Sequence, residues 1–194
     1  MASAATDKAL RMSYRIGRGE QGVLTFEPYK SALLPLWRFR TVAIAKQSSA
    51  ELWARFVAYD DAADFVGMDM CRKFVQMGMT RAKRYANHKG GRKYVKGTPV
   101  AVKSESGNGQ RYVRGTGVEL PKGEDFAGRE EKLRASEVFK KVWVRCREHE
   151  GYVRRKEEFL AEQKVWDRER KKTKVEKGEE EEVQVKEEVK VEEE

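Results

Sequence analysis

The hydrophobic pattern is clearest between residues 64 and 90, where it predicts one long helix. At about 100° of rotation per residue, four large apolar side chains fall on one line: Val66, Met70, Phe74 and Met77. Asp64 is a suitable N-cap, because its carboxylate can accept hydrogen bonds from the free N–H groups of the first turn. Gly90 suits the left-handed position that follows a helix. We therefore expect residues 65–89 to form the central helix of the fold.

The polar positions of this helix change in character halfway along it. Seven polar residues define a face that we expect to be solvated: Asp69, Arg72, Lys73, Gln76, Thr80, Lys83 and Asn87. In the second half, Arg81, Arg84 and His88 instead continue the line of the apolar residues. These three groups either pair with carboxylates or line an anion pocket. Four carboxylates elsewhere in the chain are candidate partners: Glu20, Glu27, Asp60 and Asp61.

Two more regions show helical periodicity. Thr41 predicts a short helix, and Ser48 with Glu51 forms an S-x-x-E capping box, which predicts that a longer helix begins there. From residue 125 the periodicity returns, and Gly151 divides it into two helices. Their expected buried stripes are Val138, Phe139, Val142, Trp143 and Cys146 in the first, and Tyr152, Phe159, Gln163 and Trp166 in the second.

The remaining segments are expected to add little to the core. There are four: a flexible N-terminus (1–12), a short strand (22–26), strands or a hairpin (92–114) that overlap a variable loop or hairpin (95–124), and a charged tail (171–194). The tail has no aromatic residue and is rich in Lys and Glu, a composition typical of disorder. The predicted fold class is therefore mainly α (α+β), with a single basic helical domain over residues 13–170.

A glycine-rich segment, residues 17–22, matches the dinucleotide-binding pattern G-x-G-x-x-G. A dinucleotide site also requires a preceding strand and a following helix within a βαβ unit, and the flanking sequence predicts neither. We interpret the glycines as a turn that lets Arg18 and nearby backbone N–H groups approach either an anion or another part of the fold.

The charge is distributed unevenly along the chain. The 194 residues carry a net charge of +9, but residues 171–194 contribute −4, which leaves +13 on the rest. Ten Lys or Arg and no Asp or Glu occur between residues 70 and 104. A basic body favours anionic partners, namely nucleic acid, an anionic membrane surface or phosphorylated small molecules.

Other chemistry has little support in the sequence. Cys71 and Cys146 both occupy apolar helical positions, which indicates buried thiols in a reducing compartment. Two Cys and two His at wide spacing form no zinc motif, so that we expect no metal site and no cofactor. No apolar run approaches the roughly 20 residues of a membrane span, and we expect no membrane partner.

The chain resembles the family catalogued as domain of unknown function 4385 in three segments: YRIGRGEQGVLTFEPYK (Tyr14–Lys30), LPLWRFR (Leu34–Arg40) and DFVGMDMCRKFVQMGMTRAKRYANHKGGRKY (Asp64–Tyr94). The resemblance covers about residues 14–166, and the family is mostly bacterial and fungal. It implies a soluble, intracellular and mainly helical protein. It implies no established activity, so that no catalytic residue follows from it.

Three functions are compatible with these features. The favoured one is a binding module for nucleic acid or another polyanion, in the cytoplasm or, in a eukaryote, the nucleus, which acts through the 72–96 surface. Its candidate binding residues are Arg18, Arg81, Arg84, Tyr85, Asn87, His88, Lys89, Arg92 and Lys93. The second is an interaction or scaffold protein. The third, ranked last, is an enzyme acting on a phosphorylated small molecule, with His88 as general acid or base. The oligomeric state stays open.

Overall fold

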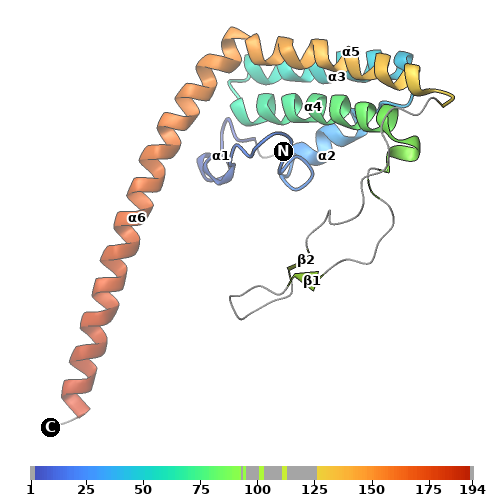
Figure 1. Ribbon diagram of the computed structural model, residues 1–194. Helices are drawn as coiled ribbons and strands as arrows, with labels where there is room; N and C mark the ends of the chain where they lie inside the picture. Colours follow the sequence, from blue (N-terminus) through green and yellow to red (C-terminus); the bar gives the residue numbers. More distant parts are fainter. Residues whose placement is uncertain (1–2, 93, 95–100, 103–110, 113–125, 193–194) are drawn as a thin grey trace.

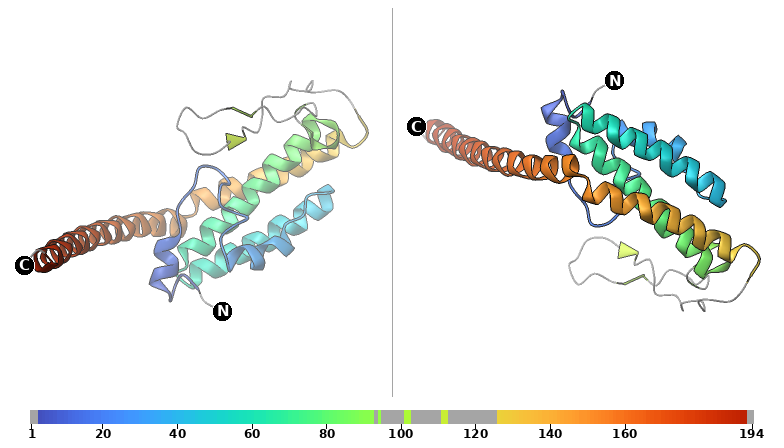
Figure 2. Two further views of the ribbon diagram at one scale, coloured as in Figure 1. Left: turned by 90° about the horizontal axis from the view of Figure 1, so that it is seen from below. Right: turned by 90° about the horizontal axis from the view of Figure 1, so that it is seen from above.

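The computed structural model describes residues 3–92, 94, 101–102, 111–112 and 126–192. Three long helices form the body: α3 (Val42–Asp61), α4 (Phe65–Asn87) and α5 (Arg129–Glu148). Helix α4 contacts both of the others, which run in the opposite direction to it (Figures 1 and 2). The mainly α fold class around a central helix is therefore confirmed.

Helix α4 begins where the sequence predicts. The Asp64 carboxylate accepts a hydrogen bond from the backbone N–H of Gly67 at 2.9 Å, as an N-cap does. At the other end, Gly90 has a left-handed backbone (φ 69°) within the short 3-10 helix η2 (Lys89–Gly91). Both ends of the central helix thus agree with the predicted range of residues 65–89 within two residues.

The N-terminal segment packs on this helix, so the predicted flexible N-terminus is wrong for residues 3–12. Helix α1 (Lys8–Ser13) buries Met12, and Ala4 is fully buried. The Ser3 hydroxyl donates to the Asp64 carboxylate at 2.7 Å. The same carboxylate accepts from the Tyr29 hydroxyl in helix α2 (Tyr29–Leu33). The N-cap of α4 therefore also anchors residues that precede it by more than thirty positions.

The predicted solvated face of α4 is wrong in the first half of the helix. Asp69 and Lys73 have no exposed surface, and Arg72 is only 8% exposed. The physical reason is that residues 14–23 run along this side of the helix. Lys73 Nζ, for example, donates to the Gln21 carbonyl at 3.0 Å.

In the second half, the buried side of α4 consists of small residues. Gly78, Ala82 and Ala86 are buried, whereas Lys83 and Arg84 are exposed. The sequence predicted that Arg84 lies in line with the core, and this prediction is wrong. Small side chains allow the two helices to approach closely here, because a Cβ atom at Gly78 would lie 2.7 Å from the ring of Phe139 in α5.

Helix α3 begins earlier than its predicted capping box. Thr41 is its N-cap, with Oγ1 accepting from the Ile44 N–H at 3.2 Å. Ser48 lies inside the helix, where its hydroxyl donates to the carbonyl of Leu36 and accepts from the N–H of Arg38. It thereby holds the connector after η1 (Leu34–Leu36), which explains why this serine does not cap a helix.

The minor elements differ from the prediction in part. Residues 22–26 form turns and no strand, so that the prediction of a strand there is wrong. Strands β1 (Ala101–Val102) and β2 (Arg111–Tyr112) pair antiparallel. Apart from residues 92 and 94, the rest of the predicted hairpin and variable loop lies outside the described residues.

The last two helices follow the predicted pattern. Helix α5 ends at Glu148 and α6 (Glu150–Glu192) begins two residues later. Phe139, Cys146, Tyr152 and Phe159 are all buried, as their stripes predict. The backbone of α6 continues through most of the predicted tail and projects away from the body as a lone helix (Figure 1). A lone helix depends on local interactions for its stability.

The contact at Gly78 gives a test of this packing. An alanine there gains about 1 kcal/mol of helix propensity, but overpacking of a filled core costs about 1–3 kcal/mol. The Phe139 ring is fully buried and cannot move aside freely. We expect Gly78→Ala to lower the free energy of unfolding in urea, and Phe139→Leu to restore part of the loss in the double variant. A more stable Gly78→Ala protein would contradict this close approach.

Candidate nucleic-acid interface

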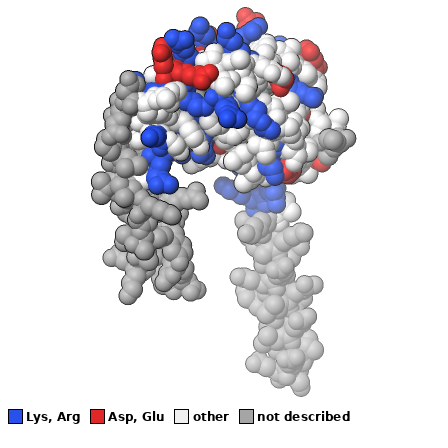
Figure 3. All heavy atoms as spheres, turned by 90° about the vertical axis from the view of Figure 1, so that its right-hand side faces the viewer, with Lys and Arg blue, Asp and Glu red and all other residues white. Residues whose placement is uncertain are grey.

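The C-terminal end of α4 presents cations to solvent. Lys83, Arg84, Lys89 and Arg92 are exposed, and none has an acidic partner within 4 Å in the part of the chain that the structure describes. Figure 3 views the molecule from this end, and Lys and Arg side chains are spread widely over its described surface. We call this surface the basic end and define it by these four residues together with Arg40, Tyr85 and Lys132.

Aromatic contacts connect the basic end to the other helices. The Tyr85 ring is 37% exposed and lies edge-on to Phe39, with 5.7 Å between ring centroids. Lys132 of α5 donates to the carbonyls of Phe39 and Arg40. The connector before α3, the end of α4 and the start of α5 thus meet at one place, and each contributes a cation.

The other predicted site residues are placed differently. Arg18 is exposed, but its turn packs on the middle of α4, where the Thr80 hydroxyl donates to Glu20 at 2.7 Å. The glycine turn therefore approaches another part of the fold. Asn87 is half-buried, and Lys93 lies outside the described residues.

Arg81 and His88 do not belong to the exposed surface of the basic end. His88 is 5% exposed, and within the described part of the chain neither its Nδ1 nor Nε of the half-buried Arg81 has a hydrogen-bond partner. Among the described residues, three of the four candidate carboxylates bind elsewhere: Glu20 to Thr80, Glu27 to Lys30 and Asp60 to Arg155. No group around His88 in the described chain completes an acid–base pair for catalysis.

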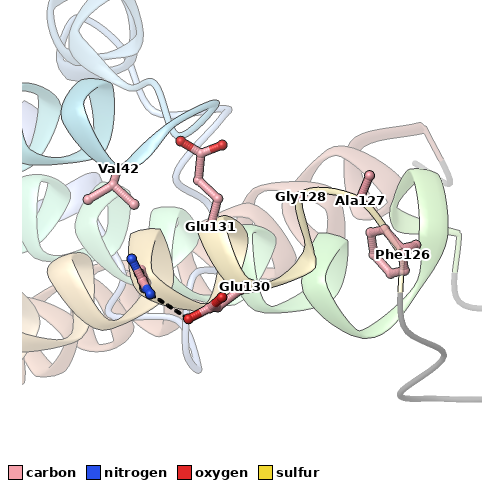
Figure 4. Close-up of a pocket in the computed structure, with 7 residues that line it drawn as sticks. Val42, Phe126, Ala127, Gly128, Glu130 and Glu131 are labelled. Carbon is pink, nitrogen blue, oxygen red and sulfur yellow. Dashed lines mark hydrogen bonds and ion pairs between the residues drawn. The ribbon is translucent and has the colours of Figure 1, made fainter.

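Two hollows adjoin the basic end. One, of about 340 Å³, is lined by Tyr85, Lys89 and Lys132 together with residues 126–128 and Glu131. The larger, of about 840 Å³, lies between Val42 of α3 and the start of α5 (Figure 4). There Glu130 is paired with Arg134, while the Glu131 side chain points away from that pair. The carboxylates of the larger hollow disfavour an anion there.

A second cluster of charges is buried towards the other end of α4. The Asp69 carboxylate accepts hydrogen bonds from the Tyr14 hydroxyl at 2.5 Å, the Tyr152 hydroxyl at 2.7 Å and Arg72 Nε at 2.7 Å. Lys73 Nζ lies 3.7 Å from it and 4.9 Å from the centre of the Tyr14 ring. Both carboxylate oxygens are therefore satisfied, and a cation balances the charge.

This environment fixes the protonation of the cluster. Burial alone would raise the pKa of Asp69, but Arg72, the Tyr14 hydrogen bond and Lys73 outweigh it and hold the pKa below its usual value. Burial lowers the pKa of Lys73, against the attraction of Asp69. Burial also raises the pKa values of the Tyr14 and Tyr152 hydroxyls, so that both remain donors to the carboxylate.

Cys71 and Cys146 are buried free thiols, as predicted. Burial raises the pKa of Cys71 well above its usual value and that of Cys146 to about 12, which leaves no thiolate nucleophile at neutral pH. Within the described part of the chain, no group of three or more His, Cys, Asp or Glu could hold a metal ion, and no helix is long and apolar enough to span a membrane.

The family described as Domain of unknown function (DUF4385) matches residues 2–162 of the chain. The chain belongs to this family. No curated protein and no solved structure matches it. The match begins twelve residues before the resemblance seen in the sequence and so includes the N-terminal segment that packs on α4. The match thus covers most of the helical body, and residues 163–192 of α6 lie outside it.

Sequence reasoning missed the Asp69 cluster in this DUF4385 domain. One signal was present, because Asp69, Arg72 and Lys73 follow the i, i+3 and i+4 spacing at which opposite charges pair on a helix. The tyrosines that bury the cluster come from positions 55 and 83 residues away. Nothing in the local pattern indicates such partners.

The Asp69 cluster should make the unfolding free energy depend on pH in the acid range. Asp69→Asn leaves Arg72 and Lys73 without a buried counter-charge, and breaking a buried pair costs about 3–5 kcal/mol. Because folding lowers the pKa of Asp69, its contribution is present in full above the unfolded value of about 3.9 and is lost as the pH falls through the folded pKa. The difference in unfolding free energy between the two proteins should therefore shrink below about pH 4.

The matched control for this prediction is Asp61→Asn, since Asp61 is exposed at the end of α3. Surface changes of this kind usually alter stability by about 0.5 kcal/mol or less. Urea unfolding at several pH values measures both variants. An equal, small effect of the two substitutions would show that the cluster does not stabilise the fold.

Proposed function

We propose that this DUF4385 domain binds single-stranded nucleic acid, without strong sequence preference, through its basic end. The observation that carries the proposal is the half-exposed ring of Tyr85 among cations that have no acidic partner in the described structure. Cations neutralise phosphates, and an accessible aromatic ring offers a stacking surface to any unpaired base. A duplex hides the faces of its bases, so that the exposed ring favours a single strand.

The arrangement of the cations supports a backbone-tracking mode of binding. Lys83 and Arg84 lie on α4, Lys89 and Arg92 follow it, and Lys132 approaches from α5. Burial lowers the pKa of Lys132, and its ammonium group already donates to backbone carbonyls. We therefore assign the phosphate contacts to the four cations at the end of α4. Contacts to phosphates alone leave the base edges unread, which fits a lack of sequence preference.

Salt dependence tests the proposal directly. If four to six phosphates are neutralised, log K for a decathymidylate should fall against log salt with a slope of roughly −3 to −4. Replacing Lys83 and Arg84 by Ala should weaken binding and reduce the slope by about 1.4, because two phosphate contacts are lost. Fluorescence anisotropy of a labelled oligonucleotide measures both quantities.

The matched control removes the same charge elsewhere. Arg154 and Lys164 are exposed on α6, away from the basic end, and their double replacement by Ala should leave the slope unchanged. If both double variants behave alike, only the net charge matters and the basic end is not the site. A slope near zero for the unchanged protein would exclude electrostatic binding altogether.

The charged tail provides a further test. Helix α6 leaves the bundle at the end opposite the basic end (Figure 1), and α4 alone spans roughly 35 Å between them. This separation exceeds the Debye length of about 8 Å at physiological salt. Deletion of residues 171–194 should therefore leave both the thermal unfolding temperature and the oligonucleotide affinity unchanged within error. Tighter binding after deletion would show instead that the net −4 tail folds back onto the basic end.

A further inference from the structure

A cavity of about 490 Å³ lies where α6 leaves the bundle. Its lining combines two chemistries. The lining includes three cations, Arg72, Arg147 and Lys156, and one carboxylate, that of Glu157. The other lining residues include the apolar side chains of Ile16, Val153 and Leu160. This cavity belongs to the Asp69 half of α4 and shares no residue with the basic end.

Arg72 is the buried cation of this cavity. Its side chain is 10% exposed, and its Nε donates a hydrogen bond to the Asp69 carboxylate at 2.7 Å. Nη1 donates to the side-chain carbonyl of Gln76 at 2.9 Å. A guanidinium has five N–H donors, so that even with the Tyr152 hydroxyl as a third acceptor, two remain for a ligand in the cavity. A fixed, pre-oriented guanidinium is well suited to a carboxylate or phosphate group.

The rim adds exposed cations and an apolar edge. Arg147 and Lys156 are exposed side chains on either side of the break between α5 and α6. Val153 and Leu160 lie seven residues apart on the same face of α6 and are 44% and 45% exposed. Large apolar side chains that stay half-exposed beside a cavity mark a surface that a ligand can cover.

We propose that this cavity binds a small organic anion whose carboxylate or phosphate head contacts Arg72, Arg147 and Lys156 and whose apolar body covers Val153 and Leu160. The single carboxylate of the lining leaves a net positive lining, which favours one anionic head. The apolar edge disfavours a bare inorganic ion, since such an ion would bury Val153 and Leu160 no better than water does. The volume of about 490 Å³ is that of a typical small-molecule site.

Calorimetric titration with octanoate tests the proposal, with acetate, inorganic phosphate and 1-octanol as comparison ligands. We expect octanoate to bind saturably and at least tenfold more tightly than each of the three, because only octanoate has both the head and the apolar body. Octyl phosphate distinguishes the head groups, and comparable or tighter binding of it than of octanoate also supports the site. If 1-octanol binds as tightly as octanoate, the cations have no role; if acetate does, the apolar edge has none. Either result overturns the proposal, as does the absence of saturable binding by both octanoate and octyl phosphate.

The variants avoid Arg72, whose loss would remove the hydrogen-bonded cation from the Asp69 carboxylate and destabilise the fold. Leu160→Glu places a carboxylate at the mouth and should weaken octanoate binding at least thirtyfold. Val165→Glu is the matched control, because Val165 is 52% exposed on the same helix but does not line the cavity, and it should change the affinity less than twofold. Lys156→Gln should weaken binding at least fivefold.

Equal effects of Leu160→Glu and Val165→Glu would place the ligand elsewhere. The two proposals remain separable, because the Lys83 and Arg84 double variant should bind octanoate normally while Leu160→Glu should bind the oligonucleotide normally.

Discussion

The Asp69 carboxylate joins three parts of the chain that are far apart in sequence. It accepts hydrogen bonds from Tyr14 in the N-terminal segment, Arg72 in its own helix and Tyr152 in the first turn of α6. Removing a charge from water costs several kcal/mol even after relaxation, so that the carboxylate is tolerated only when all of these partners are in place. Closure of the N-terminal segment and of α6 over α4 is therefore a condition for burying Asp69 at all.

Contacts with the N-terminal segment and with α3 also determine which part of α6 belongs to the body. Besides Tyr152, the Gln163 amide donates to the Tyr14 carbonyl at 2.7 Å, and Glu162 accepts two hydrogen bonds from Arg11. Arg155 donates to both the side chain and the backbone of Asp60 at the end of α3. These contacts end near Asp167, which pairs with Arg15. Beyond that point the sequence has no aromatic residue to bury, and the helix continues without the bundle.

The sequence allowed the apolar side of the fold to be predicted, but it was a poor guide to the buried polar groups. The line through Val66, Met70, Phe74 and Met77, the cap at Asp64 and the break near Gly151 all depend on local spacing, which periodicity reports directly. Lys73 falls on the polar side of the helix by spacing alone, which predicts exposure to solvent. Its actual partners, Asp69 and the Gln21 carbonyl, include one that only the tertiary fold supplies.

The candidate interface was predictable only in part, because some of its residues depend on contacts that only the tertiary fold supplies. Exposure of Lys83, Lys89 and Arg92 follows from their charge and the absence of nearby acids. The position of Arg84 depended on which side of α4 meets α5, and that side is set by Gly78 and Ala82, whose small size carries little hydrophobic signal. Arg18 could not be placed, because a turn of glycines has many possible paths until its neighbours are known.

The two candidate sites are electrically independent despite sharing one helix. Twelve residues separate Arg72 from Arg84, which corresponds to roughly 18 Å along the helix axis, about twice the Debye length at physiological salt. Asp69 also neutralises much of the field of Arg72 at its source. A charge bound at one end of α4 therefore alters the affinity at the other end little through direct electrostatics. Any coupling between the two ends would have to be mechanical, carried by the packing of Gly78 on Phe139 or by the N-terminal segment that lies along α4.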